Sequence, residues 1–239
     1  MHGGRQKVER LGVIPLCKTE AAAWPAVSQC RLSRCLLMRN FGSTIACLAI
    51  CFSLIGMSGC ASSNPPLPTP ESVDLDRFMG AWFVHGHTPI LVDKQAHNAV
   101  EHYYLNEKQE VETTYQFRDE SFSGELKTYT PTGFPKDEEA SSGARWQMQF
   151  LWPFKADYVI VHLSDDYAET IIGHPSRKYA WIMTRSPEIA DEAYESLLQR
   201  LEKIGYDRSV VRRLPHDWSD DQDRLQRIRE VGKSAPLAD

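Results

Sequence analysis

The sequence has no cysteine after Cys60, although the chain of 239 residues contains six. A domain built from the residues that follow Cys60 therefore has no disulfide to support it and must hold together by packing alone. The formal net charge is −5 and no stripe of basic residues is present, which argues against nucleic-acid binding. No internal repeat of fixed period is seen, so the repeat architectures are excluded.

Long hydrophobic runs are also missing. The most apolar segment, residues 45–57, is shorter than the roughly 20 residues that a membrane-spanning helix needs. It has the length of the hydrophobic part of a signal peptide, follows a positive charge at Arg39, and ends in Ser58-Gly59-Cys60. This pattern is typical of a bacterial lipoprotein signal, in which small residues precede the cysteine that takes the lipid. We therefore predict cleavage before Cys60 and acyl chains on Cys60. A buried core helix and secretion without lipid are the alternatives.

Composition divides the chain into five segments. We interpret residues 1–37 as a non-structural leader or an over-called start, with residues 38–59 as the lipoprotein signal peptide. The lipidated cysteine and a proline-rich spacer fill residues 60–72, and the spacer is expected to hold the domain clear of the bilayer. Residues 73–216 form the folded domain, and residues 217–239 are expected to be a flexible polar tail.

Eight segments of the domain alternate apolar and polar residues or are rich in strand-forming residues, and short turn-like segments separate most of them. Evenly spaced strands without intervening helices favour an all-β fold, either an up-and-down antiparallel barrel or a sandwich. The expected strands are Ala81–His87, Ala99–Leu105, Val111–Phe117, Gly124–Thr130, Trp146–Phe150, Tyr158–Leu163, Ala168–Gly173 and Tyr179–Arg185.

One amphipathic helix follows these strands. Ser186-Pro187 is expected to begin it, since serine caps helices and proline suits the first turn. Gly205 is expected to end it, and its apolar face must pack against the outside of the sheet. Ser209–Val211 is a candidate ninth strand.

Three motifs occur in the order found in one known family. Asp74–Trp82 resembles the opening lipocalin motif, in which a short helical turn leads through Gly-x-Trp into the first strand. Asp165-Asp166-Tyr167 occupies the place of the second motif, and Trp181–Pro187 resembles the third, which ends in a basic residue. The resemblance covers residues 73–216 and is closest to the bacterial outer-membrane lipoprotein lipocalins and to apolipoprotein D. It implies an eight-stranded antiparallel up-and-down barrel with one C-terminal α-helix packed outside.

The family motif assigns structural roles to Gly80, Trp82 and Arg185. We expect Trp82 to fill the closed end of the barrel, with the Arg185 guanidinium across the indole face. Gly80 is expected to let the chain turn sharply into the first strand.

The resemblance further implies an interior that holds a small apolar ligand. From strand parity, the expected ligand-binding residues are aromatic, aliphatic or sulfur-containing, with one histidine, and suit acyl chains. A closed core that these side chains simply fill is the alternative. The residues are Trp146, Met148, Phe150, Tyr158, Ile160, His162, Trp181 and Met183.

Other chemistry has less support in the residues. His85 and His87 share a face, as metal ligands would, but parity with Trp82 places both outside or at the rim, where we interpret them as surface histidines. No metal site and no cofactor are expected. One of Glu101 and His102 must face inward, and parity alone does not say which. No Gly-x-Ser-x-Gly nucleophile motif is present, and we predict no catalytic residues and no enzyme activity.

These observations predict a membrane-anchored lipocalin that binds or stores fatty acids, lysophospholipids or similar small apolar ligands in the cell envelope. Ala61 and Ser62 after the lipidated cysteine favour the outer membrane, with the domain facing the periplasm. A lipocalin-fold enzyme acting on a lipid, dependent on His162 or Glu101, and a structural lipoprotein without ligand are the alternatives.

Overall fold

The computed structural model describes residues 64–136 and 143–238. Cys60, the predicted signal peptide and the leader lie outside these residues. Within the described part of the chain, no helix has the length and apolar character needed to cross a membrane. The elements are α2 (Leu75–Phe78), β1 (Gly80–His87), β2 (Ala96–Leu105), β3 (Val111–Asp119), β4 (Leu126–Tyr129), β5 (Thr132–Pro135), β6 (Arg145–Leu151), β7 (Phe154–Leu163), β8 (Glu169–Gly173), β9 (Ala180–Thr184), α3 (Asp191–Lys203), the 3-10 turn η1 (Arg208–Val210), β10 (Arg212–Arg213) and α4 (Gln222–Val231).

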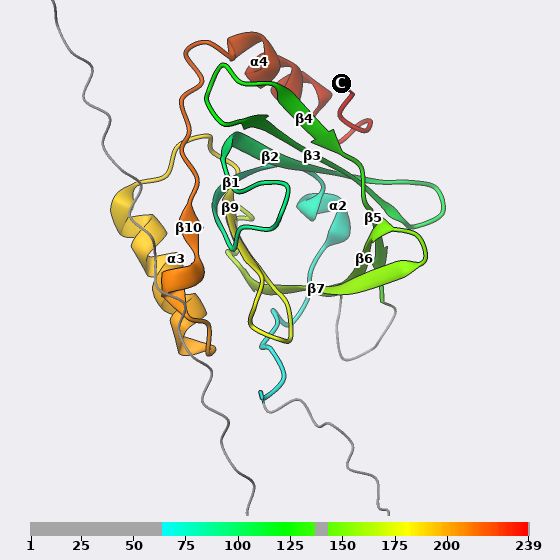
Figure 1. Cartoon of the computed structure of the whole chain (residues 1–239). Helices are drawn as coiled ribbons and strands as arrows, with labels where there is room; N and C mark the ends of the chain where they lie inside the picture. Colours follow the sequence, from blue (N-terminus) through cyan, green and yellow to red (C-terminus); the bar gives the residue numbers. More distant parts are fainter. Residues whose placement is uncertain (1–63, 137–142, 239) are drawn as a thin grey trace, which may run out of the picture. The chain divides into compact units, whose positions relative to one another are not determined.

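The strands close into an antiparallel barrel, because β9 pairs back onto β1 (Figure 1). Each barrel strand pairs with its neighbour in the chain, except that β4 and β5 share one position beside β3. The ring therefore has eight positions, and the predicted eight-stranded up-and-down barrel is confirmed. The predicted strand Gly124–Thr130 corresponds to β4, and the sequence pattern did not reveal the separate strand β5.

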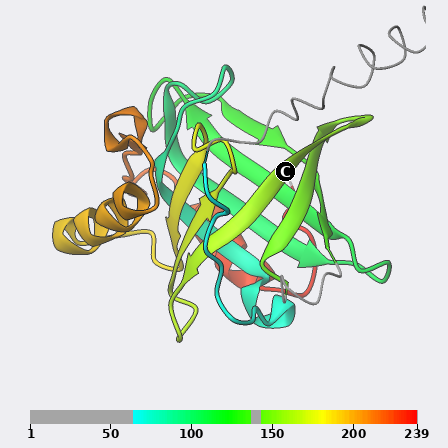
Figure 2. The same ribbon diagram turned by 90° about the horizontal axis from the view of Figure 1, so that it is seen from below.

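The closed end of the barrel is plugged by α2 and the start of β1 (Figure 2). Gly80 has a φ of +92°, a conformation that favours glycine, and this turns the chain from α2 into β1. Trp82 is buried and donates its Nε1–H to the Phe78 carbonyl at 2.9 Å. The Arg185 guanidinium lies 3.7 Å from the Trp82 ring centroid and donates to backbone carbonyls of residues 77–79 and 81. These side chains close the barrel and leave no room for a ligand at this end.

Two β-bulges interrupt the alternation of inward- and outward-facing residues. Residues after each bulge therefore face the side opposite to the one that strict alternation predicts. The register of β1 shifts between Val84 and Gly86, so that Val84 faces the core while Gly86 faces α3. His87 consequently faces inward, and the prediction that it lies on the surface is wrong. The register of β7 also shifts, between Ile160 and His162.

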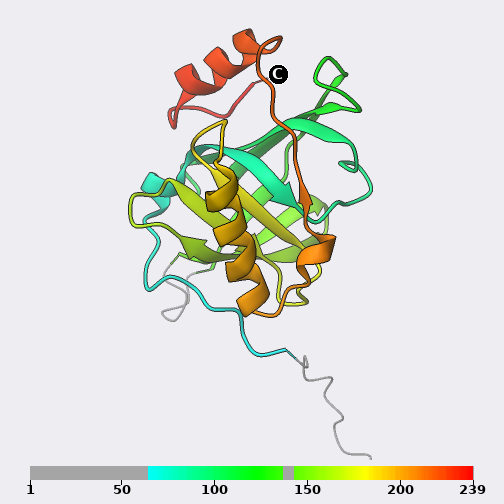
Figure 3. The same ribbon diagram turned by 90° about the vertical axis from the view of Figure 1, so that its left-hand side faces the viewer.

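Helix α3 packs against the outside of the barrel, as predicted (Figure 3). Its buried residues Tyr194, Leu197, Leu198 and Leu201 cover Ile171 and Ile182. The predicted capping role of Ser186-Pro187 is wrong, since the helix begins at Asp191 after an extended Ala190. Gly205 has a φ of +92° and ends the helix as predicted.

After α3 the chain returns to the barrel edge, slightly later than expected. Residues 209–210 lie in the η1 turn, and the added strand is β10, which pairs with Gly86 and His87 of β1. The prediction of a strand at Ser209–Val211 is therefore displaced by a few residues. The β10 segment continues across His85, whose ring lies 4.7 Å from that of His216. His85 faces outward but is covered, so the prediction of a surface histidine is wrong here too.

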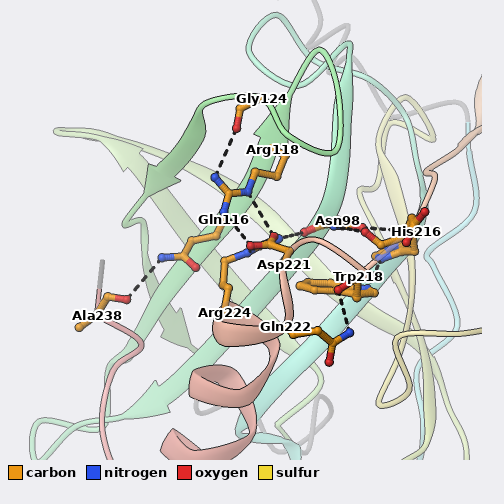
Figure 4. A network of polar contacts seen from close by, with 11 residues as sticks. Asn98, Gln116, Arg118, Gly124, His216, Trp218, Asp221, Gln222, Arg224 and Ala238 are labelled. Carbon is orange, nitrogen blue, oxygen red and sulfur yellow. Dashed lines mark hydrogen bonds and ion pairs between the residues drawn. The ribbon is translucent and has the colours of Figure 1, made fainter.

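The prediction of a flexible polar tail after residue 216 is wrong. Residues 218–238 include α4 and pack over β1 and β2 (Figure 3). They bury the outward-facing Phe83 and Val100. The segment is polar in composition but places Trp218, Leu225 and Ile228 on one side. Figure 4 shows the polar network beneath it: Arg224 is buried and donates to Asp221 at 2.7 Å and to the Asn98 carbonyl at 2.8 Å. Arg118 also donates to Asp221, at 2.6 Å.

The proline-rich segment is not wholly a free spacer. Leu67 is buried among the residues under α3, and its carbonyl accepts from Arg145 at 2.9 Å. The Pro65 carbonyl accepts from Arg177 at 2.6 Å. From residue 65 onward the chain therefore runs along the barrel instead of holding it at a distance.

Candidate ligand-binding site

The lower half of the barrel interior, next to the plug, is filled by aromatic rings. Phe78 lies 5.0 Å from Trp82 between ring centroids, and Trp146 stacks on Tyr158 at 5.4 Å. Tyr103 packs edge-on against Trp146 at 5.8 Å. Such close ring packing contributes stability and leaves space for a ligand only toward the open end.

A cavity of about 290 Å³ occupies the open half of the barrel. That volume lies at the lower limit of typical small-molecule sites, so it suits one small or slender ligand. Its walls come from the β1–β2 loop, β6, β7, the β8–β9 loop and β9. The lining residues are Ile90, Met148, Phe150, Ala156, Asp157, Tyr158, His174, Tyr179 and Trp181.

A second space of about 20 Å³ adjoins the cavity and shares Ile90, Met148, Phe150, Tyr158 and Trp181 with its lining; we call it the extension. A space of this size holds one group about as large as a water molecule. The larger space has two polar residues in its lining that are not tyrosines, the exposed Asp157 and the half-buried His174. Four buried polar residues line the extension: Asp93, Glu101, Thr113 and Tyr115. We call these four residues, with Tyr158, the polar floor of the cavity.

Glu101 is the central acceptor of the polar floor. Tyr103 donates its hydroxyl to Glu101 Oε2, and the single hydroxyl hydrogen of Tyr158 is shared between the Tyr103 oxygen and Glu101 Oε2, which lies 3.3 Å away. Burial raises the pKa of Glu101 to about 7, and the hydrogen bonds from the two tyrosines act in the opposite direction. The carboxyl group therefore changes charge near neutral pH.

Asp93 is the second acid of the polar floor and holds the β1–β2 loop in place. Its carboxylate accepts from the Ile90 N–H at 2.8 Å, from the Tyr115 hydroxyl at 3.2 Å, and bonds His87 Nδ1 at 3.2 Å. Burial raises the pKa of the Tyr115 hydroxyl well above its usual value, so it stays a donor. This loop forms one wall of the cavity mouth.

The predicted ligand-binding residues divide into three groups. Met148, Phe150, Tyr158 and Trp181 line the cavity. Trp146, Ile160 and Met183 face inward but are fully buried in the packed core, so the structure does not place them at the cavity wall.

The prediction that His162 lines the ligand-binding site is wrong. The bulge in β7 pairs it with Ile171, which faces the outer cluster under α3. Since antiparallel partners share a face, His162 points out of the barrel. Neither the predicted lining role nor a catalytic role inside the barrel is available to it.

Sequence reasoning missed most of the polar floor. Glu101 pairs in register with Trp82 on one side and with Tyr115 on the other, so all three face inward. Strand parity alone did not show which of Glu101 and His102 faces inward, and the register identifies Glu101. His102 faces outward and bonds the Gly232 carbonyl at 2.8 Å. The register between β1 and β2, once known, is the signal that identifies these residues.

The rim of the cavity mouth carries exposed apolar side chains on two loops. Trp152 and Phe154, at the β6–β7 hairpin, are 81% and 73% exposed, and Leu91 of the β1–β2 loop is 84% exposed. Figure 2 shows the β6–β7 hairpin at the end of the barrel opposite α2. We call this surface the apolar rim; its members are Leu91, Val92, Phe150, Leu151, Trp152 and Phe154.

Other hollows and metal chemistry fit less well. Two larger hollows, of about 530 and 570 Å³, lie outside the barrel, the first beside Arg77 and Asp165 and the second beside Glu188 and His216. Neither is an enclosed apolar site. Among residues 64–136 and 143–238, no cluster of three or more His, Cys, Asp or Glu side chains is arranged to hold a metal ion.

Comparison with known proteins agrees with this geometry. The family model described as a lipocalin-like domain matches residues 73–216. The chain is 26% identical over 155 residues to temperature-induced lipocalin-1 of Arabidopsis thaliana, covering 61% of this chain and 80% of the relative. It is 26% identical over 161 residues to the outer membrane lipoprotein Blc of Escherichia coli, covering 63% and 84%.

A solved structure shares the fold at low sequence identity. Insecticyanin of the tobacco hornworm Manduca sexta superposes with a TM-score of 0.52 and 17% identity, covering 65% of this chain and 87% of that one. The family-model match, the closed barrel with its outer helix and the Trp82–Arg185 plug identify the chain as a member of the lipocalin family, whose members bind small hydrophobic ligands.

Proposed function

We propose that this protein is a lipid-anchored lipocalin of the cell envelope. In the cavity at the open half of its barrel it binds a small, slender apolar ligand of the acyl-chain class. Fatty acids and lysophospholipids are the first candidates. The observation that carries the proposal is the open apolar cavity lined by Met148, Phe150, Tyr158 and Trp181. The proposed role is binding and not catalysis.

The apolar rim supports a lipid source for the ligand. Exposed tryptophan and phenylalanine side chains prefer the boundary between water and acyl chains, and each large apolar side chain that is buried there contributes about 1.5 to 3 kcal/mol. Phe150 belongs both to this rim and to the cavity wall. A bilayer in contact with the rim would thus meet an apolar surface that continues into the cavity.

The place where the chain joins the barrel is consistent with this orientation. The Pro65 carbonyl bonds Arg177 of the β8–β9 loop, whose neighbours His174 and Tyr179 line the cavity. Cys60 is five residues earlier in the sequence, a span of at most about 18 Å. Acyl chains on Cys60 would therefore tether the cavity mouth close to the membrane. The similarity to an outer membrane lipoprotein supports an outer-membrane location.

Titration of the delipidated protein with acyl ligands tests the proposal. We expect saturable quenching of tryptophan fluorescence, since Trp181 lines the cavity. Ala156 pairs with Met148 on the inward face, so Ala156→Trp should fill the cavity and abolish binding. Lys108→Trp, on the exposed β2–β3 turn, is the matched control and should bind normally. Absence of saturable binding by the unsubstituted protein would refute the proposal.

A further inference from the structure

The polar floor has a chemical bias that the apolar walls do not have. When Glu101 is ionised, the hydroxyl donors in and beside the floor already have partners. Tyr158 and the neighbouring Tyr103 donate within the Glu101 cluster, Tyr115 donates to Asp93, and Thr113 donates weakly to the Met148 sulfur at 3.9 Å. The atoms left for a ligand are oxygen lone pairs, on two carboxyl groups and on hydroxyls. His87 Nε2 has no partner, but His87 is not among the residues that line the cavity.

An anionic group fits this floor poorly. A carboxylate or phosphate entering head first would meet Glu101 and Asp93 without a free donor to stabilise it, which is costly in a buried site. A fatty acid or lysophospholipid must therefore keep its charged head at the mouth. It would then place a methyl end against a floor of acceptors, which gains nothing from them.

A cation with hydrogen-bond donors fits well. A primary ammonium group has three donors and is about the size of the 20 Å³ extension. Beside Glu101, the extension is lined by the rings of Tyr115, Tyr158 and Trp181, and aromatic rings attract cations through their π faces. A carboxylate within an aromatic lining, at the end of an apolar channel, is a suitable environment for an amine.

We infer that the cavity selects amphiphiles whose buried end carries an ammonium group or another hydrogen-bond donor, and that Glu101 is the specificity-determining acceptor. This inference rests on the proposed binding of a ligand in the cavity and names its chemical class. An apolar chain would lie along Met148 and Phe150, with its polar end at the floor. Long-chain alkylamines and long-chain amino alcohols belong to this class.

The test compares three probes that share one alkyl chain: decylammonium, 1-decanol and decyl sulfate, each below its micelle concentration. Binding to the full chain is measured by titration calorimetry at pH 8. We expect decylammonium to bind most tightly and decyl sulfate most weakly. Glu101→Gln keeps the shape and removes the charge, so it should weaken decylammonium at least about tenfold. Glu107→Gln, on the exposed β2–β3 turn, removes the same charge elsewhere and should change nothing.

A pH series provides a test that needs no variant. Decylammonium stays charged from pH 5.5 to 8.5, whereas Glu101 ionises within this range. The groups that face Glu101 are Asp93, Tyr103, Tyr115 and Tyr158, and burial holds the three tyrosine pKa values well above the range. The affinity for decylammonium should therefore rise with pH.

The outcomes separate this inference from the proposed function. Saturable binding of all three probes with equal affinity, or an unchanged preference in Glu101→Gln, overturns the amine selectivity and leaves ligand binding intact. If none of the probes binds, the proposed function fails as well. Decylammonium affinity that stays constant across the pH series also contradicts the role of Glu101.

Discussion

Replacement of Glu101 by glutamine should make the protein more stable at alkaline pH, because the buried carboxyl is costly to ionise. Its pKa is raised from 4.5 to about 7, mainly by burial. Between these pH values Glu101 stays protonated in the native protein but is ionised in the unfolded chain. Its contribution to the free energy of unfolding is therefore fully present below pH 4.5 and is lost as the pH rises through 7. The difference corresponds to about 3 kcal/mol.

Glutamine at position 101 has no such penalty and keeps an oxygen that can accept from Tyr103 and Tyr158. Urea unfolding followed by tryptophan fluorescence, at intervals from pH 4.5 to 8.5, measures the difference in free energy of unfolding between the two proteins. Subtraction removes the contributions of other titrating groups, including His85 and His216. Glu107→Gln serves as the control. A difference that stays constant within about 0.5 kcal/mol across the series would refute the reasoning.

Three further predictions concern other parts of the molecule. Trp82→Ala should destabilise the fold by roughly 3 to 5 kcal/mol in denaturant unfolding, and a loss under about 0.5 kcal/mol would exclude the plug role. Burial lowers the pKa of His216 to about 3. Between pH 6.5 and about 3 its imidazole therefore stays neutral in the native protein, whereas in the unfolded chain it takes up a proton. His216→Gln should therefore lose less stability between pH 6.5 and 4 in the same assay. With Cys60→Ser as the background, Trp152→Ser should weaken vesicle partitioning at least about tenfold in sedimentation, while Val210→Ser should not.

Strand parity predicted well wherever the ladder is regular. The expected position of Arg185 over the plug was enough to predict that Trp181 and Met183, at two-residue spacing before it, face inward, and they do. The same reasoning failed at His87 and His162, since each follows a bulge that adds one residue to its strand. Alternation carries no sign of such an insertion, so the facing of every residue beyond it is reversed.

The polar floor and the tail were missed for a different reason. Glu101 faces inward because of its pairing with Trp82, which depends on the register between two strands. The segment after residue 216 looked solvent-exposed because its composition is charged, yet Leu225 and Ile228 share one face and Arg224 is paired in a buried network. Composition averages over both faces of a short helix and so conceals a narrow apolar stripe.

The proposed function requires that the cavity in the open half of the barrel holds a small apolar ligand supplied by the membrane. Mass spectrometry of lipids that co-purify with the full chain, extracted gently from the envelope, tests it most directly when the unsubstituted protein is compared with Ala156→Trp. We predict one enriched class of single-chain amphiphile, stoichiometric with the unsubstituted protein and absent from the variant. Equal amounts of the same lipids on both proteins, or none on either, would contradict the claim.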